Sequence, residues 1–325
     1  MRKLYVLIVA LLLTGTAKAQ YAWDIGFHVG AANYLGEMGG KENPRRDFIW
    51  DLKLSQTRWA FGVFARRKIN RFISINAGLM YLRIQGADDL SIYRPRRFRN
   101  LNFRNDMFEL YVRPEFTIYA DNDIGGRGRY RTDFRLFAYV GAAVFYHNPK
   151  GQLYGEGSWV ALRPLDTELA GYSQVGFAIP AGMGFHFTFK RRHRIGWDFG
   201  WRTTFTDYLD DVSTVYVDPN LLPGGINGQS AQFQDQSQPA IDAAYSADPS
   251  LNYDSWILQY GYEAGGPGPS RPKENIRGDP THNDSYLTMT LTYSYVLKGQ
   301  SNFYRQRYSW VRGKKRIGRK SRAKF

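Results

Sequence analysis

The stretch that decides the fold runs from Met107 to Tyr119 and reads MFELYVRPEFTIY. Its side chains alternate strictly between two kinds. One set is apolar and comprises Phe108, Leu110, Val112, Phe116 and Ile118. The other set is mostly polar or charged and comprises Glu109, Tyr111, Arg113, Glu115 and Thr117. Because successive side chains point to opposite faces of a β-strand, this pattern predicts a strand with one apolar and one charged face.

Seven further segments of ten to fifteen residues alternate in the same way, at 23–35, 58–67, 72–82, 134–146, 175–189, 195–205 and 285–297. Strands of about 9–11 residues cross a bilayer when tilted. The links between them are short or moderate at 68–71, 121–133 and 190–194, and long at 36–57, 83–106, 147–173 and 209–284. We therefore predict an all-β fold over residues 20–298, an eight-stranded antiparallel transmembrane β-barrel with long extracellular loops.

The polar faces decide between a membrane barrel and a soluble β-sandwich or lipocalin-like barrel. They carry seven charged residues that could not form a dry core: Asp24, Arg66, Glu109, Arg113, Glu115, Asp198 and Arg202. In a narrow membrane barrel these groups can face the lumen and pair with one another. We expect a lumen ion-pair network. Pro114 and Pro180 lie inside predicted strands, where each removes a ladder hydrogen bond, so β-bulges could lie there.

The N-terminus predicts export. Residues 1–19 combine a positive start, an apolar run from Leu4 to Leu13 and the small residues Ala17 and Ala19, as in a signal peptide. The chain has no cysteine, which excludes disulfides and thiolate metal sites. Its mean hydropathy of −0.47 excludes a polytopic helical membrane protein.

The net charge of +15 is unevenly distributed. Residues 20–298 hold 31 basic and 29 acidic residues, whereas residues 299–325 hold ten basic and no acidic residues. After eight strands this tail is expected in the periplasm, where nucleic acid is the wrong partner. The predicted docking residues are Tyr308, Trp310, Arg312, Lys314, Lys315, Arg316, Arg319 and Lys320. The alternative is a solvated tail that aids solubility.

The loop 209–284 is acidic, with eleven Asp and Glu against three Lys and Arg. Its length predicts either a plug or partner contact over the barrel mouth, with partial disorder as the alternative. Asp207, Asp210, Asp211 and the nearby Asp218 could bind calcium, or they could cap a turn. No metal or cofactor is predicted from so loose a pattern.

Enzymatic barrels place His with Ser or Asp near the outer rim. His147 and His282, with Ser285 and Asp284, are the candidates, but their spacing is not specific. We therefore expect that this protein is not an enzyme.

Three runs carry a family resemblance. They are NYLGEMGG at 33–40, FAIPAG at 177–182 and FTDYLDDVS at 205–213. Over about 20–298 the chain resembles the PorG-like family of outer-membrane barrels from Bacteroidetes. This resemblance implies a non-enzymatic subunit of the type IX protein secretion and gliding machinery. It also implies partners, namely a periplasmic ring built from a lipoprotein and its partner protein, besides outer-membrane lipids. The alternative is an OmpA-like structural or adhesive surface barrel with ligand-binding outer loops.

Overall fold

The computed structural model describes residues 23–36, 38, 54–91, 94–121, 132–190, 192–237, 239, 242, 246, 277–278 and 280–297. The predicted signal peptide at 1–19 lies outside the described residues. So do the whole basic tail at 299–325, including Tyr308 and Trp310, and most of residues 238–276. The structure therefore bears on the barrel and on the described parts of its loops.

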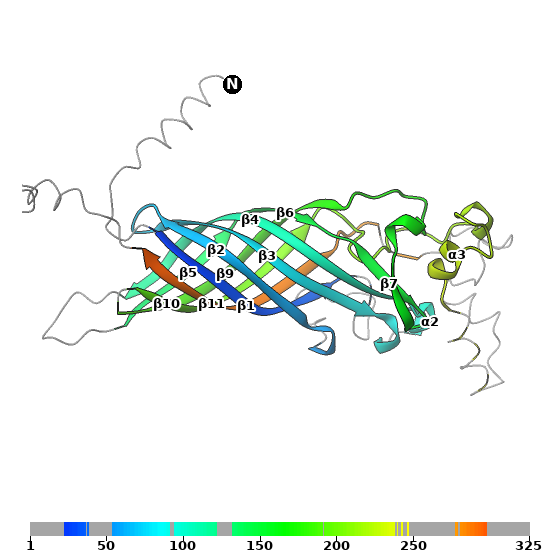
Figure 1. Ribbon diagram of the computed structural model, residues 1–325, viewed down its shortest axis with the longest axis horizontal. Helices are drawn as coiled ribbons and strands as arrows, with labels where there is room; N and C mark the ends of the chain where they lie inside the picture. Colours follow the sequence, from blue (N-terminus) through cyan, green and yellow to red (C-terminus); the bar gives the residue numbers. More distant parts are fainter. Residues whose placement is uncertain are drawn as a thin grey trace, which may run out of the picture.

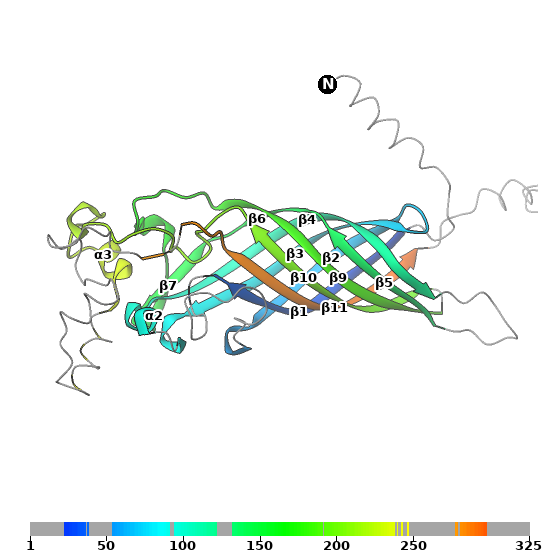
Figure 2. The same cartoon turned by 180° about the vertical axis from the view of Figure 1, so that it is seen from behind.

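The described strands form a closed antiparallel ring (Figures 1 and 2). In chain order the ring contains β1 (Trp23–Leu35), β2 (Arg58–Lys68), β3 (Ile73–Ala87), β4 (Asn102–Asp121), β5 (Asp133–Val140) with β6 (Ala142–Tyr146), β9 (Val175–Phe189), β10 (His193–Thr204) and β11 (Ser285–Leu297). Each strand pairs with the next, and β11 pairs with β1 from Trp23↔Leu297 to Leu35↔Ser285. Because β5 and β6 together occupy one position between β4 and β9, the ring has eight strand positions, as predicted.

The break between β5 and β6 falls at Gly141, and both prolines flank it. The Gly141 N–H donates to the Pro180 carbonyl at 2.8 Å, but proline has no N–H to return the bond. On the other side, the pairing of Val112 with Ala142 and Glu115 with Tyr139 places Pro114 beside Val140. The register shift in this region lies between Thr117 and Tyr119, not at either proline. The two prolines thus flank the break between β5 and β6, and neither forms a β-bulge.

Strands β3 and β4 are longer than the sequence pattern suggested. β3 ends at Ala87 and β4 begins at Asn102, so the link between them covers 88–101 and not 83–106 as expected. The reason is that inward and outward side chains keep alternating along both strands, although the outward ones become polar. The inward side chains there are apolar and buried, namely Leu82, Ile84, Phe103 and Met107. The shortened link contains η3 (Asp88–Leu90) and α2 (Arg94–Arg99).

The other long links also contain structure. Residues between β6 and β9 form a hairpin of β7 (Pro149–Leu153) and β8 (Glu156–Ala161), followed by η4 (Arg163–Leu165). β7 pairs with the extended end of β4. η2 (Leu54–Gln56) precedes β2, and η5 (Pro219–Leu221) and α3 (Gln229–Gln234) follow β10. All these elements lie at one end of the barrel, opposite the short turns, the start of β1 and the end of β11 (Figure 1).

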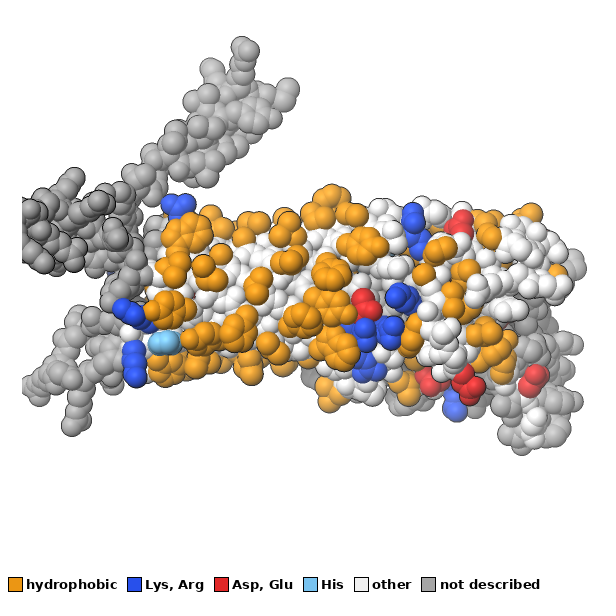
Figure 3. Space-filling view, in the orientation of Figure 1, with side chains coloured by type: hydrophobic (Ala, Val, Ile, Leu, Met, Phe, Trp, Pro, Cys, Tyr) orange, Lys and Arg blue, Asp and Glu red, His pale blue; other side chains and the backbone are white. Residues whose placement is uncertain are grey.

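The outside of the barrel is apolar. Outward side chains such as Ile25, Phe61, Leu79, Leu110, Phe177 and Leu291 are 50–66% exposed. Figure 3 shows such side chains covering the visible face of the barrel strands, with Lys and Arg at both borders of this belt. Charged side chains instead lie inside, which is the reverse of a soluble barrel, so the soluble alternative is wrong. No helix within the described ranges is long and apolar enough to span a membrane.

Candidate functional site

All seven residues of the predicted lumen network lie inside the barrel. They come from β1, β2, β4 and β10, and each is at most 4% exposed: Asp24, Arg66, Glu109, Arg113, Glu115, Asp198 and Arg202. Their inward direction follows from strand geometry alone, since each stands one position away from a lipid-facing apolar residue.

Five of these residues, together with Arg194, form a continuous chain of ion pairs, called here the lumen chain. Arg194 contacts Asp24 at 2.7 Å, and Asp24 contacts Arg66 at 3.2 Å. Arg66 then contacts Glu115 at 2.7 Å.

From Glu115 the lumen chain runs across the barrel. Glu115 lies 3.8 Å from Nη2 of Arg113, and that nitrogen lies 2.5 Å from Oδ2 of Asp198. Arg194 and Asp198 are both on β10, so the chain visits β1, β2 and β4 and returns to the strand where it began. Arg194 was predicted only as part of a turn, because its partner lies 170 residues away in sequence.

A second pair joins Arg202 to Glu109, with Nε and Oε2 3.3 Å apart. The hydroxyl of Tyr286 donates to Glu109 at 2.6 Å, and Arg202 also donates to the hydroxyl of Thr288. Neutral donors support the lumen chain as well: Asn76 donates to Glu115 at 2.7 Å, and Tyr139 to Asp198 at 2.7 Å. Each lumen carboxylate therefore has an arginine and at least one neutral donor, which offsets its burial.

The long-loop half of the interior is filled differently. Leu209 and Val212, from the link after β10, are fully buried against Met80, Leu82, Ile84, Phe103 and Met107. The amide of Asn105 donates to the Leu209 carbonyl at 2.8 Å, which fixes the segment inside the mouth. This segment, residues 205–217, is called here the plug. The start of the loop 209–284 therefore enters the barrel.

Two plug-level carboxylates share one hydroxyl. Tyr34 Oη lies 2.7 Å from Oδ2 of Asp210 and 2.5 Å from Oδ1 of Asp284. A tyrosine has one hydroxyl proton, so a second proton is needed for both contacts to be hydrogen bonds. Burial raises the pKa of Asp210 and of Asp284, and the neighbouring carboxylates Asp210 and Asp207 raise that of Asp284 further. The pair therefore holds a proton to a higher pH than a free carboxyl would.

A third group of contacts ties the plug to other loops. Arg277 contacts Glu168 at 2.7 Å and donates to the Asp211 carbonyl at 2.6 Å. The Asp211 carboxylate accepts from Thr167 and Tyr172, each at 2.7 Å, and burial raises its pKa to about 6. Three links distant in sequence, 88–101, 147–174 and 205–284, are thereby joined over the mouth, since Arg99 also donates to the Arg277 carbonyl.

These partners leave the calcium hypothesis without a site. Asp210 and Asp211 turn to different partners, and no three His, Cys, Asp or Glu side chains converge as metal ligands within the described residues. Asp218 caps the η5 turn, accepting from the Asn220 N–H at 3.0 Å. The capping alternative therefore applies to Asp218.

The histidines named as catalytic candidates contact other groups at the long-loop end. His147 lies 3.0 Å from the Ser173 carbonyl, and Asp284 accepts from Tyr34 and from the Leu209 N–H. The ring of His147 therefore has its partner at Ser173, and Nδ1 of His282 lies 2.6 Å from the Thr281 hydroxyl.

The closed ring, the apolar belt and the filled, ion-paired lumen define a membrane-spanning β-barrel of the outer-membrane type. Residues 2–220 match the family described as "Domain of unknown function (DUF6089)", and the chain belongs to this family. No curated protein matches the chain.

Two solved structures are similar at low identity. The attachment invasion locus protein Ail of Yersinia pestis, solved in complex with the heparin analogue sucrose octasulfate, is 10% identical, with a TM-score of 0.34, covering 85% of this chain and 99% of that one. Neisserial surface protein A is 7% identical, with a TM-score of 0.36, covering 85% of this chain and 97% of that one. At these TM-scores neither likeness adds to what the strand pairing shows.

Proposed function

We propose that this protein is a non-enzymatic outer-membrane barrel that anchors a periplasmic assembly, the ring of the type IX secretion and gliding machinery, to the membrane. The resemblance to PorG-like barrels at 33–40, 177–182 and 205–213 suggests this role. In this proposal the ring lipoprotein and its partner dock at the short-turn end of the barrel.

The observation that carries the proposal is the doubly closed interior. The lumen chain crosses the barrel at one level, and Leu209 and Val212 fill it at another. An eight-stranded barrel of this kind is filled by side chains, so it offers no path for a solute. A barrel closed at both levels suits attachment better than transport.

The short-turn end has the charge that such docking requires. In outer-membrane barrels short turns face the periplasm. Arg67, Arg71 and Lys190 are exposed there, and Lys68 and Arg192 are half-buried. The tail adds ten basic residues on the same side of the membrane in this proposal. A surface of this sign favours an acidic protein partner.

Affinity purification of the full-length protein from detergent-solubilised membranes tests the proposal. We expect the ring components to co-purify with the wild-type chain, and recovery to fall several-fold on deletion of residues 303–325 or in the double variant Arg71→Glu/Lys190→Glu. Arg97→Glu, an exposed charge reversal at the long-loop end, is the matched control. Unchanged recovery and unchanged secretion in both test variants would reject the docking surface.

The structured loops at the long-loop end of the barrel favour a second function. The β7–β8 hairpin, α2, α3 and the plug form an organised cap, and on it Leu221 is 67% exposed and Ile226 61% exposed. Exposed apolar residues on such a cap suit an adhesive or structural surface barrel. If this alternative holds, Leu221→Ser/Ile226→Ser should abolish binding to surface ligands and leave periplasmic co-purification unchanged.

A further inference from the structure

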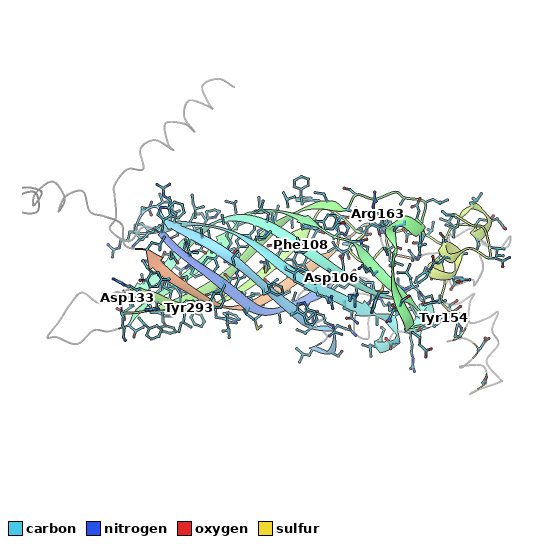
Figure 4. The ribbon with its side chains drawn as sticks, in the orientation of Figure 1. Asp106, Phe108, Asp133, Tyr154, Arg163 and Tyr293 are labelled. Carbon is cyan, nitrogen blue, oxygen red and sulfur yellow. The ribbon has the colours of Figure 1, made fainter. Side chains whose placement is uncertain are left out.

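The apolar belt ends abruptly on the outward face of β3 and β4. Tyr81 stands opposite Phe108, and the next outward pair is Arg83 opposite Asp106. One step further, Gln85 stands opposite Arg104. Figure 4 labels Phe108 and Asp106 on this face, and Figure 3 shows charged side chains gathered where the orange belt stops. This boundary lies toward the long-loop end.

The charges at this boundary are held by aromatic rings. The Arg83 guanidinium lies 4.6 Å from the Trp59 ring centroid, and the Arg104 guanidinium lies 4.5 Å from that of Trp159. Trp59 belongs to β2 and Trp159 to the β7–β8 hairpin. Cation–π contacts of this kind fix the planar groups while leaving their edges available as donors.

Asp106 is bound more closely by Arg83 than by Arg104. Arg83 Nε and Nη2 lie 2.5 and 3.1 Å from its two oxygens, and the Tyr81 hydroxyl donates to it at 2.8 Å. Arg104 Nε is 3.9 Å from Asp106, and that buried nitrogen has no hydrogen-bond partner within the described part of the chain. The charge of Arg104, whose side chain is 22% exposed, is therefore balanced, among the described residues, only by the more distant Asp106, which Arg83 already contacts at closer range.

Further cations lie around the same point. Lys150 on β7 is the register partner of Arg104, and Arg58 donates to the side chain of Gln85 at 2.7 Å. We call Arg58, Arg83, Arg104, Lys150 and Asp106 the rim cluster. It contains four cations and a single carboxylate, so it carries a net positive charge at the edge of a lipid-facing surface.

We infer that the rim cluster binds the phosphate of an anionic lipid headgroup in the outer leaflet. A lipid fits because its acyl chains would lie on the adjoining apolar belt while its phosphate meets Arg104 and Lys150. Tryptophans at the same level are typical of the headgroup region. The inference rests on the proposed outer-membrane orientation, which turns the long-loop end outward.

Lipid binding to the purified full-length protein in phosphatidylcholine nanodiscs tests this inference. The probes are diphosphorylated lipid A, monophosphorylated lipid A and inorganic phosphate. We expect the first to bind most tightly, and Arg104→Gln/Lys150→Gln to weaken it about tenfold, as expected when charge-assisted contacts are lost. Arg97→Gln, which removes an exposed charge away from the belt, should bind as the wild type does. Heat-modifiable mobility in detergent gels shows that each variant is folded.

The outcomes separate cleanly. Equal affinity of wild type and Arg104→Gln/Lys150→Gln, or an equal loss in Arg97→Gln, would overturn the inference. Inorganic phosphate binding as tightly as lipid A would assign the site to free phosphate and overturn the lipid inference. Because the assay contains no ring component, its result is independent of periplasmic docking.

Discussion

The two levels of the barrel interior neutralise buried acids in opposite ways. In the lumen chain, Asp24, Glu115 and Asp198 each contact an arginine that projects from a different strand. At the level of the plug, Asp210 and Asp284, the residue just before β11, meet at the hydroxyl of Tyr34 and hold a proton instead. Strands have fixed spacing, so they can position opposite charges. A loop folded into the mouth fits more readily when its acids are neutral, because an uncharged carboxyl costs less to bury.

The largest effect is expected when one lumen charge is removed. Arg113→Met leaves Asp198 without a cation in a buried site, which should cost about 3–5 kcal/mol in free energy of unfolding. Denaturant titration in detergent micelles, read by gel mobility, measures the loss. The double variant Arg113→Met/Asp198→Leu removes both charges and should regain part of it. A double variant less stable than the single one would contradict the ion-pair account.

A smaller and more local effect is expected when the plug loses its apolar anchor. Leu209→Ala removes a fully buried side chain, which should destabilise the plug by about 2–4 kcal/mol while the barrel stays closed. Hydrogen exchange of residues 205–217 reports plug opening, and gel mobility reports the barrel. Leu221→Ala, at a residue 67% exposed, is the control. If both variants exchange alike, Leu209 does not hold the plug.

The smallest effect is expected when the pH is raised, which should weaken the plug. Burial raises the folded-state pKa of Asp210 and Asp284, and it raises that of Asp211 from 3.8 to about 6. Groups with a raised folded pKa contribute stability that is fully present below the unfolded pKa and lost as pH rises through the folded one. The groups facing the pair are Tyr34 on β1, Asp207 in the plug, Arg99 in the link between β3 and β4, and Arg277 farther along the same loop as the plug.

Protection of residues 205–217 against hydrogen exchange, corrected for the intrinsic rate, should therefore fall about tenfold between pH 5 and 8. Asp284→Asn keeps one member of the pair neutral at every pH and should flatten part of this dependence. Asp218→Asn, which alters an exposed turn cap, should retain it. An unchanged slope in Asp284→Asn would show that the pair does not titrate in this range.

Strand geometry explains how much could be predicted. Alternation at 107–119 predicts both the lipid-facing side of β4 and the inward direction of Glu109, Arg113 and Glu115, because the pleat is a local property of the chain. Which arginine meets which carboxylate depends on register and on the lumen cross-section. Neither is encoded in any one segment, so the pairing of Arg194 with Asp24 was not predicted.

The plug was only partly predictable for the same reason. The loop's length and acidity favoured a plug or partner contact, but they could not show that Leu209 and Val212 enter the barrel. Arg277 meets Glu168 across 109 residues of sequence, a contact that only the closed mouth brings about. The calcium hypothesis at Asp207, Asp210 and Asp211 failed because sequence spacing does not determine side-chain direction.

The return of the lumen chain to β10 has a consequence for assembly. Arg66 can meet Asp24 as soon as β1 and β2 pair, but Arg113 finds Asp198 only when β10, the seventh of the eight barrel strands, has joined the ring. Until the hairpin of β10 and β11 docks, the nascent sheet holds a cation on β4 that lacks this partner. Closure then seals the last seam of the sheet and neutralises that cation in one event. The final step of folding should therefore be strongly cooperative.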